Sequence, residues 1–450
     1  MLGENKLKEI AEKALKHSSA EATQLTIWAW DSGLTRFATS YIHQNVSEEN
    51  ISISTQCVNN KKIGNANTNS LDKIDGTISK ANEISKLCPP NPEWPGFANQ
   101  SPIAEANTFI PETQKFTPEE RAKGCKTIID RATAEGKDLQ AYGSFVSGTM
   151  EGCIANSNGL FVYNKATSAT ISTTIIGKSG TGYAAAGSRD VRQINYNDVA
   201  EIAVKKAVLS QNPVKIEPGK YEVILEPLAV VELLEFLSWL GFNALSYQEG
   251  RSPFSGKLGQ KLMGDNITIW DDGLDAKGFP FPFDSEGTPV QKVMLVENGV
   301  VKNMVYDLRS AKKEGKTSTG HSSGNSAYGA SPSNLFMKGD NNTLESMVSK
   351  SSKAILVTRF WYTNIIDPMT VALTGMTRDG TYLIENGKVT KSLKNLRFTQ
   401  SVIEALSQVL ELSKALPIPG SMNYGVPYLN GSVVPALKIK DWNFTGVSEH

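Results

Sequence analysis

Residue types that bind metals are scarce in this sequence of 450 residues, which contains only four histidines and four cysteines. A hydrolytic zinc site needs about three protein ligands and an open position for water. No histidine lies within a helical turn of another, and neither HExxH nor CxxC occurs. The sequence therefore shows no ready-made zinc centre, and we expect the cysteines to be reduced thiols. These residues are His17, His43, His321, His450, Cys57, Cys88, Cys125 and Cys153.

An excess of charge of either sign is also lacking, because Lys+Arg and Asp+Glu both number 46. The densest basic run, residues 309–316, contains Glu314 and no aromatic residue. Proteins that bind nucleic acid usually carry a basic patch or stripe. The charge pattern therefore predicts no direct contact with nucleic acid.

A long uninterrupted apolar run is missing as well. The most apolar stretch, residues 228–245, contains Glu232 and Glu235, which favours a buried helix over a membrane span. Residues 1–17 carry charges throughout, unlike a signal peptide. These features predict a cytoplasmic protein with no membrane contact.

What the sequence does contain is a globular composition, 40% hydrophobic and 20% charged, and enough length for two or three domains. Residues 1–88 read as an N-terminal α/β module, with strands at 23–30 and 34–42 joined by a turn at 31–33. A proline-rich linker follows at 89–116. A second α/β module at 117–212 begins with a helix start at Thr117, Pro118 and Glu120.

The remaining residues, 219–450, are dominated by strand signals. A strand at 221–225 precedes the apolar helix, and two Asn-Gly pairs, at Asn298 and Asn386, predict tight hairpins. An amphipathic helix is expected at 401–416. The predicted fold class is α+β, with N-terminal α/β modules followed by a large, mainly antiparallel β-rich C-terminal domain.

Three motifs that could carry chemistry have simpler interpretations. Residues 320–324 match GxSxG, but neither a strand before them nor a helix after them is predicted, so a Gly/Ser loop is favoured over a nucleophile elbow. Glycines at 180, 182 and 187 are favoured as part of a hairpin over a dinucleotide loop. The carboxylate clusters at 271–272 and 284–286 lie in sequences typical of turns.

The order of several segments resembles the TldD/PmbA family, also called the modulator-of-DNA-gyrase family. The resemblance covers most of the chain. It rests on residues 34–38 and 42–45, the SPFSGKLG segment at 252–259, DDG at 271–273, residues 284–289, TSTGH at 317–321, and YLIENG at 382–387.

This resemblance implies a protein that works as a dimer, with zinc in the family's catalytic branch. That branch carries HExxxH on a helix upstream of the FSG segment and a cysteine ligand near the C-terminus. The matching positions here are Glu235, Phe236 and Leu240, and no cysteine follows Cys153. The chain thus looks like the PmbA/TldE-like branch that lacks HExxxH, with zinc expected only in a catalytic partner and no cofactor of its own.

The leading hypothesis is a non-catalytic subunit of a TldD/TldE-type metalloprotease acting on unfolded or small peptides, paired with a TldD-type catalytic subunit or with itself. One alternative is a metallopeptidase active by itself, through residues outside the motif or a metal at an interface. Another is a non-proteolytic regulatory binding protein related to gyrase or a toxin–antitoxin pair. Candidate residues of a peptide cleft, taken from the segments that resemble the family, are Phe254, Ser255, Thr319, Gly320 and His321.

Overall fold

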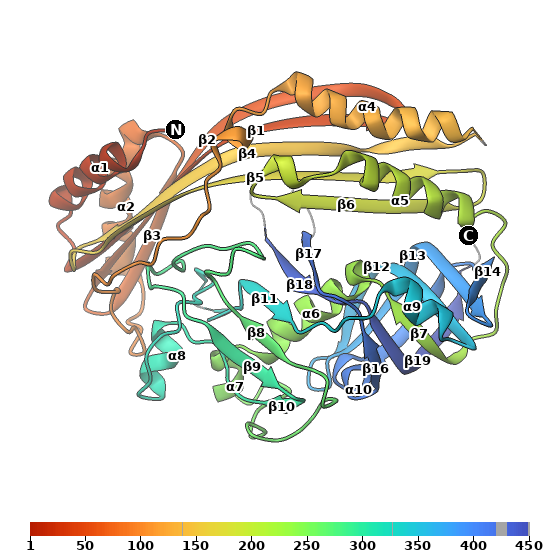
Figure 1. The fold of residues 1–450 in the computed structure, drawn as a ribbon. Helices are drawn as coiled ribbons and strands as arrows, with labels where there is room; N and C mark the ends of the chain where they lie inside the picture. Colours follow the sequence, from red (N-terminus) through yellow and green to blue (C-terminus); the bar gives the residue numbers. More distant parts are fainter. Residues whose placement is uncertain (137, 326, 420–429, 449–450) are drawn as a thin grey trace.

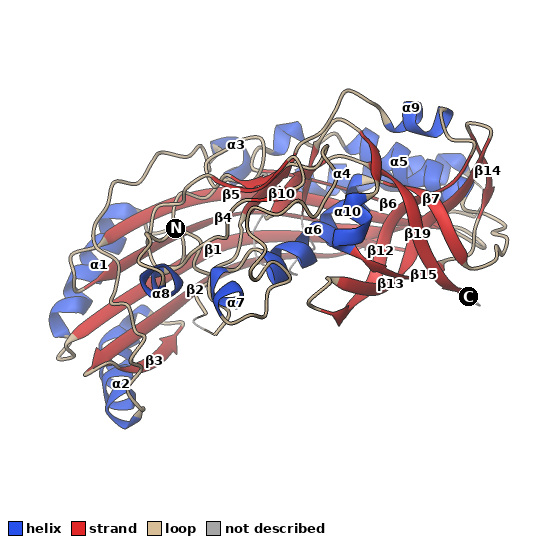
Figure 2. Ribbon diagram, turned by 90° about the horizontal axis from the view of Figure 1, so that it is seen from below, coloured by secondary structure: helices blue, strands red, loops and turns tan. Residues whose placement is uncertain are grey.

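A long curved sheet arches over a second body formed by the C-terminal part of the chain (Figure 1). This computed structural model describes residues 1–136, 138–325, 327–419 and 430–448. Viewed from below, the strands of the long sheet run behind the C-terminal body, and the end of the sheet near α1 and α2 extends beyond it (Figure 2). The predicted α+β class with a β-rich C-terminal part is confirmed.

The long sheet is antiparallel, with strand order β3-β2-β1-β4-β5-β6. The ranges predicted as separate modules, 1–88 and 117–212, contribute three strands each to it. The strands are β1 Ala22–Ala38, β2 Tyr41–Asn59, β3 Lys62–Thr68, β4 Gln140–Asn156, β5 Phe161–Ile176 and β6 Thr181–Ser188.

The predicted turn at 31–33 is wrong, because β1 runs straight through it and the chain reverses at Thr39 and Ser40, where φ is +49° and +58°. Gly33 serves a different purpose. A Cβ atom there would lie 2.3 Å from Cζ of Arg121, which reaches across the sheet from a covering helix. The glycine therefore allows close packing and does not mark a turn.

Helices cover the outer face of this sheet, away from the C-terminal body (Figure 1). Apolar residues of β1 alternate toward them, as expected for a strand with one covered face. The predicted helix start at Thr117 is confirmed, with a capping box between Thr117 and Glu120. The elements are α1 Glu4–His17, η1 Leu71–Lys73, α2 Ile74–Leu87, α3 Pro111–Gln114, α4 Pro118–Glu135, η2 Val191–Gln193 and α5 Tyr196–Leu209.

The C-terminal body contains two sheets. One has the order β10-β9-β8-β11-β18-β17, and the other has the order β12-β7-β19-β15-β13-β14 with β16 on β19. The strands are β7 Gly219–Leu225, β8 Ile269–Asp271, β9 Val293–Glu297, β10 Val300–Val301, β11 Asn334–Met337, β12 Lys353–Asp367, β13 Ala372–Glu385, β14 Lys388–Ser392, β15 Leu396–Ser401, β16 Val409–Leu412, β17 Leu416–Pro419, β18 Gly431–Val434 and β19 Leu437–Val447.

Both predicted Asn-Gly hairpins are confirmed, between β9 and β10 and between β13 and β14. Asn298 and Asn386 adopt φ of +48° and +50°. The helix predicted at 401–416 is wrong in its length, because it ends at Ser407 and the chain then pairs with β19 as strand β16. The helices of this body are α6 Pro227–Gly241, α7 Ala244–Gln248, α8 Leu308–Lys313, α9 Leu344–Ser349 and α10 Val402–Ser407.

Helix α6 contributes six buried residues, from Ala229 to Leu237, to the main hydrophobic core of the C-terminal body. The predicted apolar helix at 228–245 is therefore buried, although it breaks after Gly241, where the Asn243 side chain caps α7. None of the helices in the described ranges combines the length and the apolar character that a membrane crossing demands.

The arch and the C-terminal body are joined by polar contacts at one end of the long sheet. Thr181 Oγ1 of β6 donates to Asp379 Oδ1 at 2.6 Å. Lys206 Nζ of α5 forms an ion pair of 2.6 Å with Glu226, and both side chains are largely buried. Toward the other end, loops of the C-terminal body approach the inner face of the sheet and enclose a cleft.

Candidate functional site

The cleft contains a cavity of about 540 Å³ between the inner face of the long sheet and loops of the C-terminal body. Its walls are mainly apolar and aromatic, as in most sites that bind small molecules or peptide side chains. The lining residues are Trp28, Trp30, Ser52 and Met150 from the sheet, and Phe281, Phe283, Asp284, Ser285, Val290, Gly320, His321, Ser322, Ser331 and Ser333 from the loops.

Strand alternation directs the two tryptophans into the cavity. In β1 the odd-numbered residues Leu25 and Ile27 are buried under the helices, so Trp28 and Trp30 point to the opposite face. The ring of Trp28 packs 5.8 Å from that of Phe281. On the neighbouring strand, Gly152 leaves room for the indole, because a Cβ atom there would lie 2.2 Å from it.

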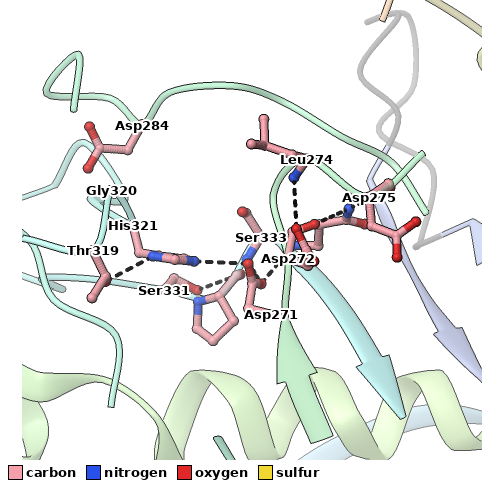
Figure 3. Close-up of polar contacts among 12 residues, drawn as sticks. Asp271, Asp272, Leu274, Asp275, Asp284, Thr319, Gly320, His321, Ser331 and Ser333 are labelled. Atoms are coloured by element: carbon pink, nitrogen blue, oxygen red, sulfur yellow. Dashed lines mark hydrogen bonds and ion pairs between the residues drawn. The ribbon is translucent and has the colours of Figure 1, made fainter. Parts of the chain in front are cut away.

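The back of the cavity is organised by a buried pair between His321 and Asp271 (Figure 3). Nε2 of His321 lies 2.9 Å from Asp271 Oδ1, and neither side chain is exposed. The other carboxylate oxygen accepts from the backbone N–H groups of Ser333 and Asn334, at 2.7 and 2.8 Å. Because a carboxylate only accepts, we assign the proton on this side of the ring to Nε2.

The second ring nitrogen of His321 is also occupied, since Nδ1 lies 2.9 Å from Thr319 Oγ1. With both nitrogens used, the imidazole is fixed in orientation behind the cavity wall. The pair is therefore suited to positioning the 319–322 loop. It does not place a free imidazole nitrogen beside a nucleophile, as a serine hydrolase needs.

Position 320 requires glycine, both because of its backbone conformation and because other atoms lie very close to it. Its φ is +72°, and a Cβ atom there would lie 2.1 Å from the carbonyl oxygen of Pro289. No strand precedes the loop, and no helix follows it within the described residues. The GxSxG match is therefore a packed loop, as the sequence predicted.

Asp284 closes the cavity beside this loop. Its Oδ2 accepts from the backbone N–H of Ser322 at 2.8 Å, and its Oδ1 accepts from those of Glu286 and Thr288 at 2.9 Å each. Burial raises the pKa of Asp284, although these hydrogen bonds oppose the shift. Burial also raises the pKa of Glu286, and the nearby Asp284 carboxylate adds to that shift.

Because these pKa values are raised by folding, stability is expected to fall as pH increases. Below about 4.3, the ordinary value for glutamate, both the folded and unfolded forms hold the proton. Above it, the unfolded chain releases the proton first, so it binds fewer protons than the folded chain and unfolding becomes easier until the raised pKa is passed. Glu286→Gln should therefore gain at least about 1 kcal/mol relative to the parent between about pH 5 and about pH 8.

Urea unfolding of both proteins across that range measures this difference. The same substitution at exposed Glu345 is the control for a change of net charge. Parallel pH profiles for the parent and Glu286→Gln would contradict the assignment of a raised pKa to this carboxyl.

The positions that match the family's metal motif lie on α6. Phe236 and Leu240 are partly buried and pack against the core, so neither offers a donor atom. Glu235 is exposed, and it lines a smaller cavity of about 220 Å³. Across the described ranges, no group of three His, Cys, Asp or Glu side chains is arranged to hold a metal ion. The residues present therefore do not fit a zinc site of the family's kind.

Glu235 nevertheless faces the cleft system. Its cavity shares Ser331 and Ser333 with the larger one, so the two adjoin. The side chain reaches solvent from a concave wall, where the surrounding protein raises its pKa to about 7 and repulsion from Glu232 adds to the shift. A single carboxylate in this setting can accept a hydrogen bond or attract a cation.

The predicted cleft residues divide into two groups. Gly320 and His321 line the cavity, and Thr319 supports His321 from behind. Phe254 is a correction, because it is completely buried with its ring 5.2 Å from that of Phe242. Ser255 lies beside it, and its hydroxyl donates to the carbonyl oxygen of Tyr247 at 3.0 Å.

Sequence reasoning missed the aromatic wall and the partners of His321. The sequence places Trp28 and Trp30 in a strand, and Asp271 and Asp284 in turns that belong to the segments resembling the family, without indicating that they share one site. The alternation of β1 does separate the tryptophans from the buried leucine and isoleucine. Nothing in the sequence indicates that Phe281, more than 200 positions away, faces them.

Comparison with known families matches two parts of the chain. The family model described as "PmbA/TldA metallopeptidase C-terminal domain" matches residues 218–446. The model described as "PmbA/TldA metallopeptidase central domain" matches residues 112–211. The first alone covers more than half of the chain.

Individual relatives agree with this match. An uncharacterized protein of Methanocaldococcus jannaschii is 36% identical over 197 residues, 43% of this chain and 46% of its own length. A metalloprotease TldD homolog of Buchnera aphidicola is 25% identical over 266 residues, 57% of this chain and 54% of its own length. The chain thus spans about half the length of these curated relatives.

Among solved structures, TldE from Thermococcus kodakarensis has the same fold. It superimposes with a TM-score of 0.86 at 21% identity, covering 98% of this chain and 100% of that one.

Proposed function

Because the chain belongs to the TldD/PmbA family of metallopeptidases, we propose that it is a non-catalytic, PmbA/TldE-like subunit of a heteromeric metalloprotease. Its partner is a TldD-type subunit that carries the zinc, and its substrates are unfolded or small peptides. In this arrangement the chain contributes binding surface and the partner contributes the chemistry.

The observation that carries the proposal is the side-chain set on α6. Hydrolysis by zinc requires ligands for the ion and a group that accepts a proton from the attacking water. Phenylalanine and leucine at 236 and 240 can do neither, and Glu235 alone is one donor of the three that such a site needs. Substitution of the whole set, together with the shortage of other donors nearby, favours a subunit without its own metal chemistry.

The cleft supports the peptide part of the proposal. Its aromatic and aliphatic walls suit the side chain of an extended peptide, and apolar burial is the main source of affinity in such sites. The fixed His321–Asp271 pair maintains the shape of the cavity without supplying a reactive group. A preformed cavity loses less entropy when a peptide enters it.

The proposal is tested by mixing the purified chain with a TldD-type subunit from the same source. We expect a stable complex on size-exclusion chromatography and faster cleavage of an unfolded peptide than the partner achieves alone. Metal analysis should find zinc on the partner and less than about a tenth of an equivalent on this chain. Equal cleavage with and without the chain, and no complex, would contradict the proposal.

The same measurements address the alternatives. Chelator-sensitive cleavage by this chain alone would indicate a peptidase active by itself. Binding of a gyrase-related or toxin–antitoxin protein, with no complex with a TldD-type subunit, would indicate a regulatory binding protein.

A further inference from the structure

A second cavity, of about 680 Å³, adjoins the aromatic one on the inner face of the long sheet. Trp28, Ser285 and Ser322 line both cavities, so the two form one continuous trough. The half beside Phe281 is aromatic, whereas the other half is lined mainly by polar side chains.

The floor of this second half is made of uncharged polar side chains from three neighbouring strands. Strand register places them in two rows across β1, β2 and β3. Side chains in such rows are about 5 Å apart, close enough to hydrogen-bond to one another or to a shared ligand. The rows are Gln24, Gln56 and Asn65, and next to them Thr26, Ser54 and Asn67.

Parts of these rows are already linked. Gln56 Nε2 donates to Asn65 Oδ1 at 3.0 Å, and Ser54 Oγ donates to Asn67 Oδ1 at 2.6 Å. These bonds orient the side chains and leave further donor and acceptor positions directed into the trough, since each amide has two donor hydrogens and an oxygen with two lone pairs.

Gln24 supplies the observation that points to a ligand. Its Oε1 is buried and has no hydrogen-bond partner among the described residues. A buried acceptor without a partner is unfavourable, so a group that donates to it from a bound molecule would be favoured there. Gln24 lies at the inner end of its row, where an N–H group of a molecule in the trough could satisfy it.

The charged side chains that line the trough opposite the polar rows, on the C-terminal body, already have ion-pair or hydrogen-bond partners. Arg309 forms an ion pair with Glu93. Asp307 accepts from the backbone N–H of Ser310 at 2.8 Å, and Glu286 accepts from that of Leu308 at 3.0 Å. Trp94 and Phe97 complete the rim with their rings 5.5 Å apart, edge to face. An acidic ligand group entering this half would lose its water without gaining an opposite charge, because Arg309 is already paired with Glu93 and the other charged side chains of the wall are the carboxyl groups Glu286 and Asp307.

We propose that the trough selects peptides in which an apolar residue is flanked on one side by uncharged polar residues. The apolar side chain enters the aromatic half beside Trp28 and Phe281. Asparagine, glutamine, serine or threonine side chains then lie over the polar rows and bond to Gln24 and Gln56. This specificity rests on the proposed function, because it assigns the class of peptide that the same cleft receives.

Two observations favour a peptide over a neutral saccharide. The aromatic and polar halves are continuous, so the ligand must join an apolar group to amide or hydroxyl groups in one linear chain. In addition, the side-chain amides of Asn and Gln can both donate to Gln24 and accept from neighbouring amides. A saccharide would satisfy the polar half and leave most of the apolar half uncovered.

The test is calorimetric titration of the isolated chain with three probes. The first is a capped peptide with one phenylalanine followed by asparagine, glutamine and serine. The second is the same peptide with aspartate and glutamate in place of the amides. The third is maltotetraose. We expect the first probe to bind at least about tenfold more tightly than the other two, corresponding to about 1.4 kcal/mol.

Variants of the chain test whether the polar rows themselves contribute to peptide binding. Gln24→Met and Gln56→Ala should each weaken binding of the first probe about tenfold and leave the weak binding of the second unchanged. Gln44→Ala is the matched control, because Gln44 lies on the same strand as Gln56 but outside both cavities. Thermal unfolding of Gln24→Met should occur at the parent's temperature or higher, since the substitution removes an unsatisfied acceptor.

Equal affinity for the neutral and acidic peptides, or stronger binding of maltotetraose, would overturn the inference. So would unchanged binding by both glutamine variants. These titrations need no partner subunit, whereas the proposed function is tested by complex formation and cleavage. Failure of one is therefore distinguishable from failure of the other.

Discussion

Replacing Asp271 with alanine is expected to lower the free energy of unfolding by about 3–5 kcal/mol, because it breaks a fully buried pair and leaves its partners unsatisfied. The carboxylate accepts from His321 Nε2 and from two backbone N–H groups. All three donors would lose their acceptor at a position where neither side chain of the pair is exposed. Urea unfolding monitored by circular dichroism measures the loss.

Asp271→Asn is the control, because it removes the negative charge and keeps a side chain of nearly the same size and shape. Its amide oxygen can accept from the two backbone groups, and its NH₂ group can donate to Nε2 if the imidazole proton moves to Nδ1. We expect this variant to lose less than half as much stability as the alanine variant. If Asp271→Ala costs less than about 1 kcal/mol, the pair does not organise the 319–322 loop and the cleft wall has another support.

Gly320→Ala is expected to destabilise the protein by at least about 3 kcal/mol. Alanine is disfavoured at φ of +72° by about 1–2 kcal/mol. In addition, its Cβ atom would lie 2.1 Å from the carbonyl oxygen of Pro289. The two segments cannot separate easily, because the N–H of Gln291 donates to the Thr319 carbonyl at 3.0 Å and that of Ser331 to the His321 carbonyl at 2.8 Å.

Gly315→Ala is the matched control for backbone conformation. Gly315 has a similar φ of +65°, but an added Cβ atom would meet no atom within 4 Å. Its loss should be about 1–2 kcal/mol, the conformational part alone. Equal losses at the two glycines would show that the contact with Pro289 relaxes without cost. Weaker peptide binding by Gly320→Ala at temperatures where it remains folded would place the loop in the cleft wall.

Structure that depends on neighbouring residues could be predicted from the sequence. The capping box at Thr117 and the two Asn-Gly hairpins formed as expected, because their signals lie within four residues of one another. The apolar helix at 228–241 formed for a similar reason, since its apolar run is long and its flanks carry proline and glycine.

Two predictions failed where distant residues overrode a local signal. The sequence Asp-Ser-Gly at 31–33 is typical of a turn, yet the strand continues because β2 and β4 pair with it on both sides. The glycine is instead explained by Arg121, 88 positions away. Beyond Ser407, apolar residues with helical spacing adopt a strand, because β19 offers unpaired backbone groups there.

In the candidate site, too, some features follow from residue type alone and others depend on distant parts of the chain. The mismatch of Glu235, Phe236 and Leu240 with the metal motif is a matter of residue type, so the sequence alone is enough to state it. The His321–Asp271 pair joins residues 50 positions apart, and it exists only because β8 and the 319–322 loop meet in the C-terminal body. The burial that raises the pKa of Asp284 likewise depends on how the two parts of the chain pack.

For this protein, the sequence by itself determined which chemistry is missing, which hairpins and caps form, and which family the chain resembles. These properties depend on residue identity or on contacts between near neighbours, and in these segments the tertiary packing agrees with the local preference. The tertiary structure alone decided that Trp28 faces Phe281, that His321 is held by Asp271, and that polar rows from three strands extend the cleft. The physical reason is that a sheet displays alternate residues on opposite faces, and only long-range packing decides which face is covered and which remains open to a ligand.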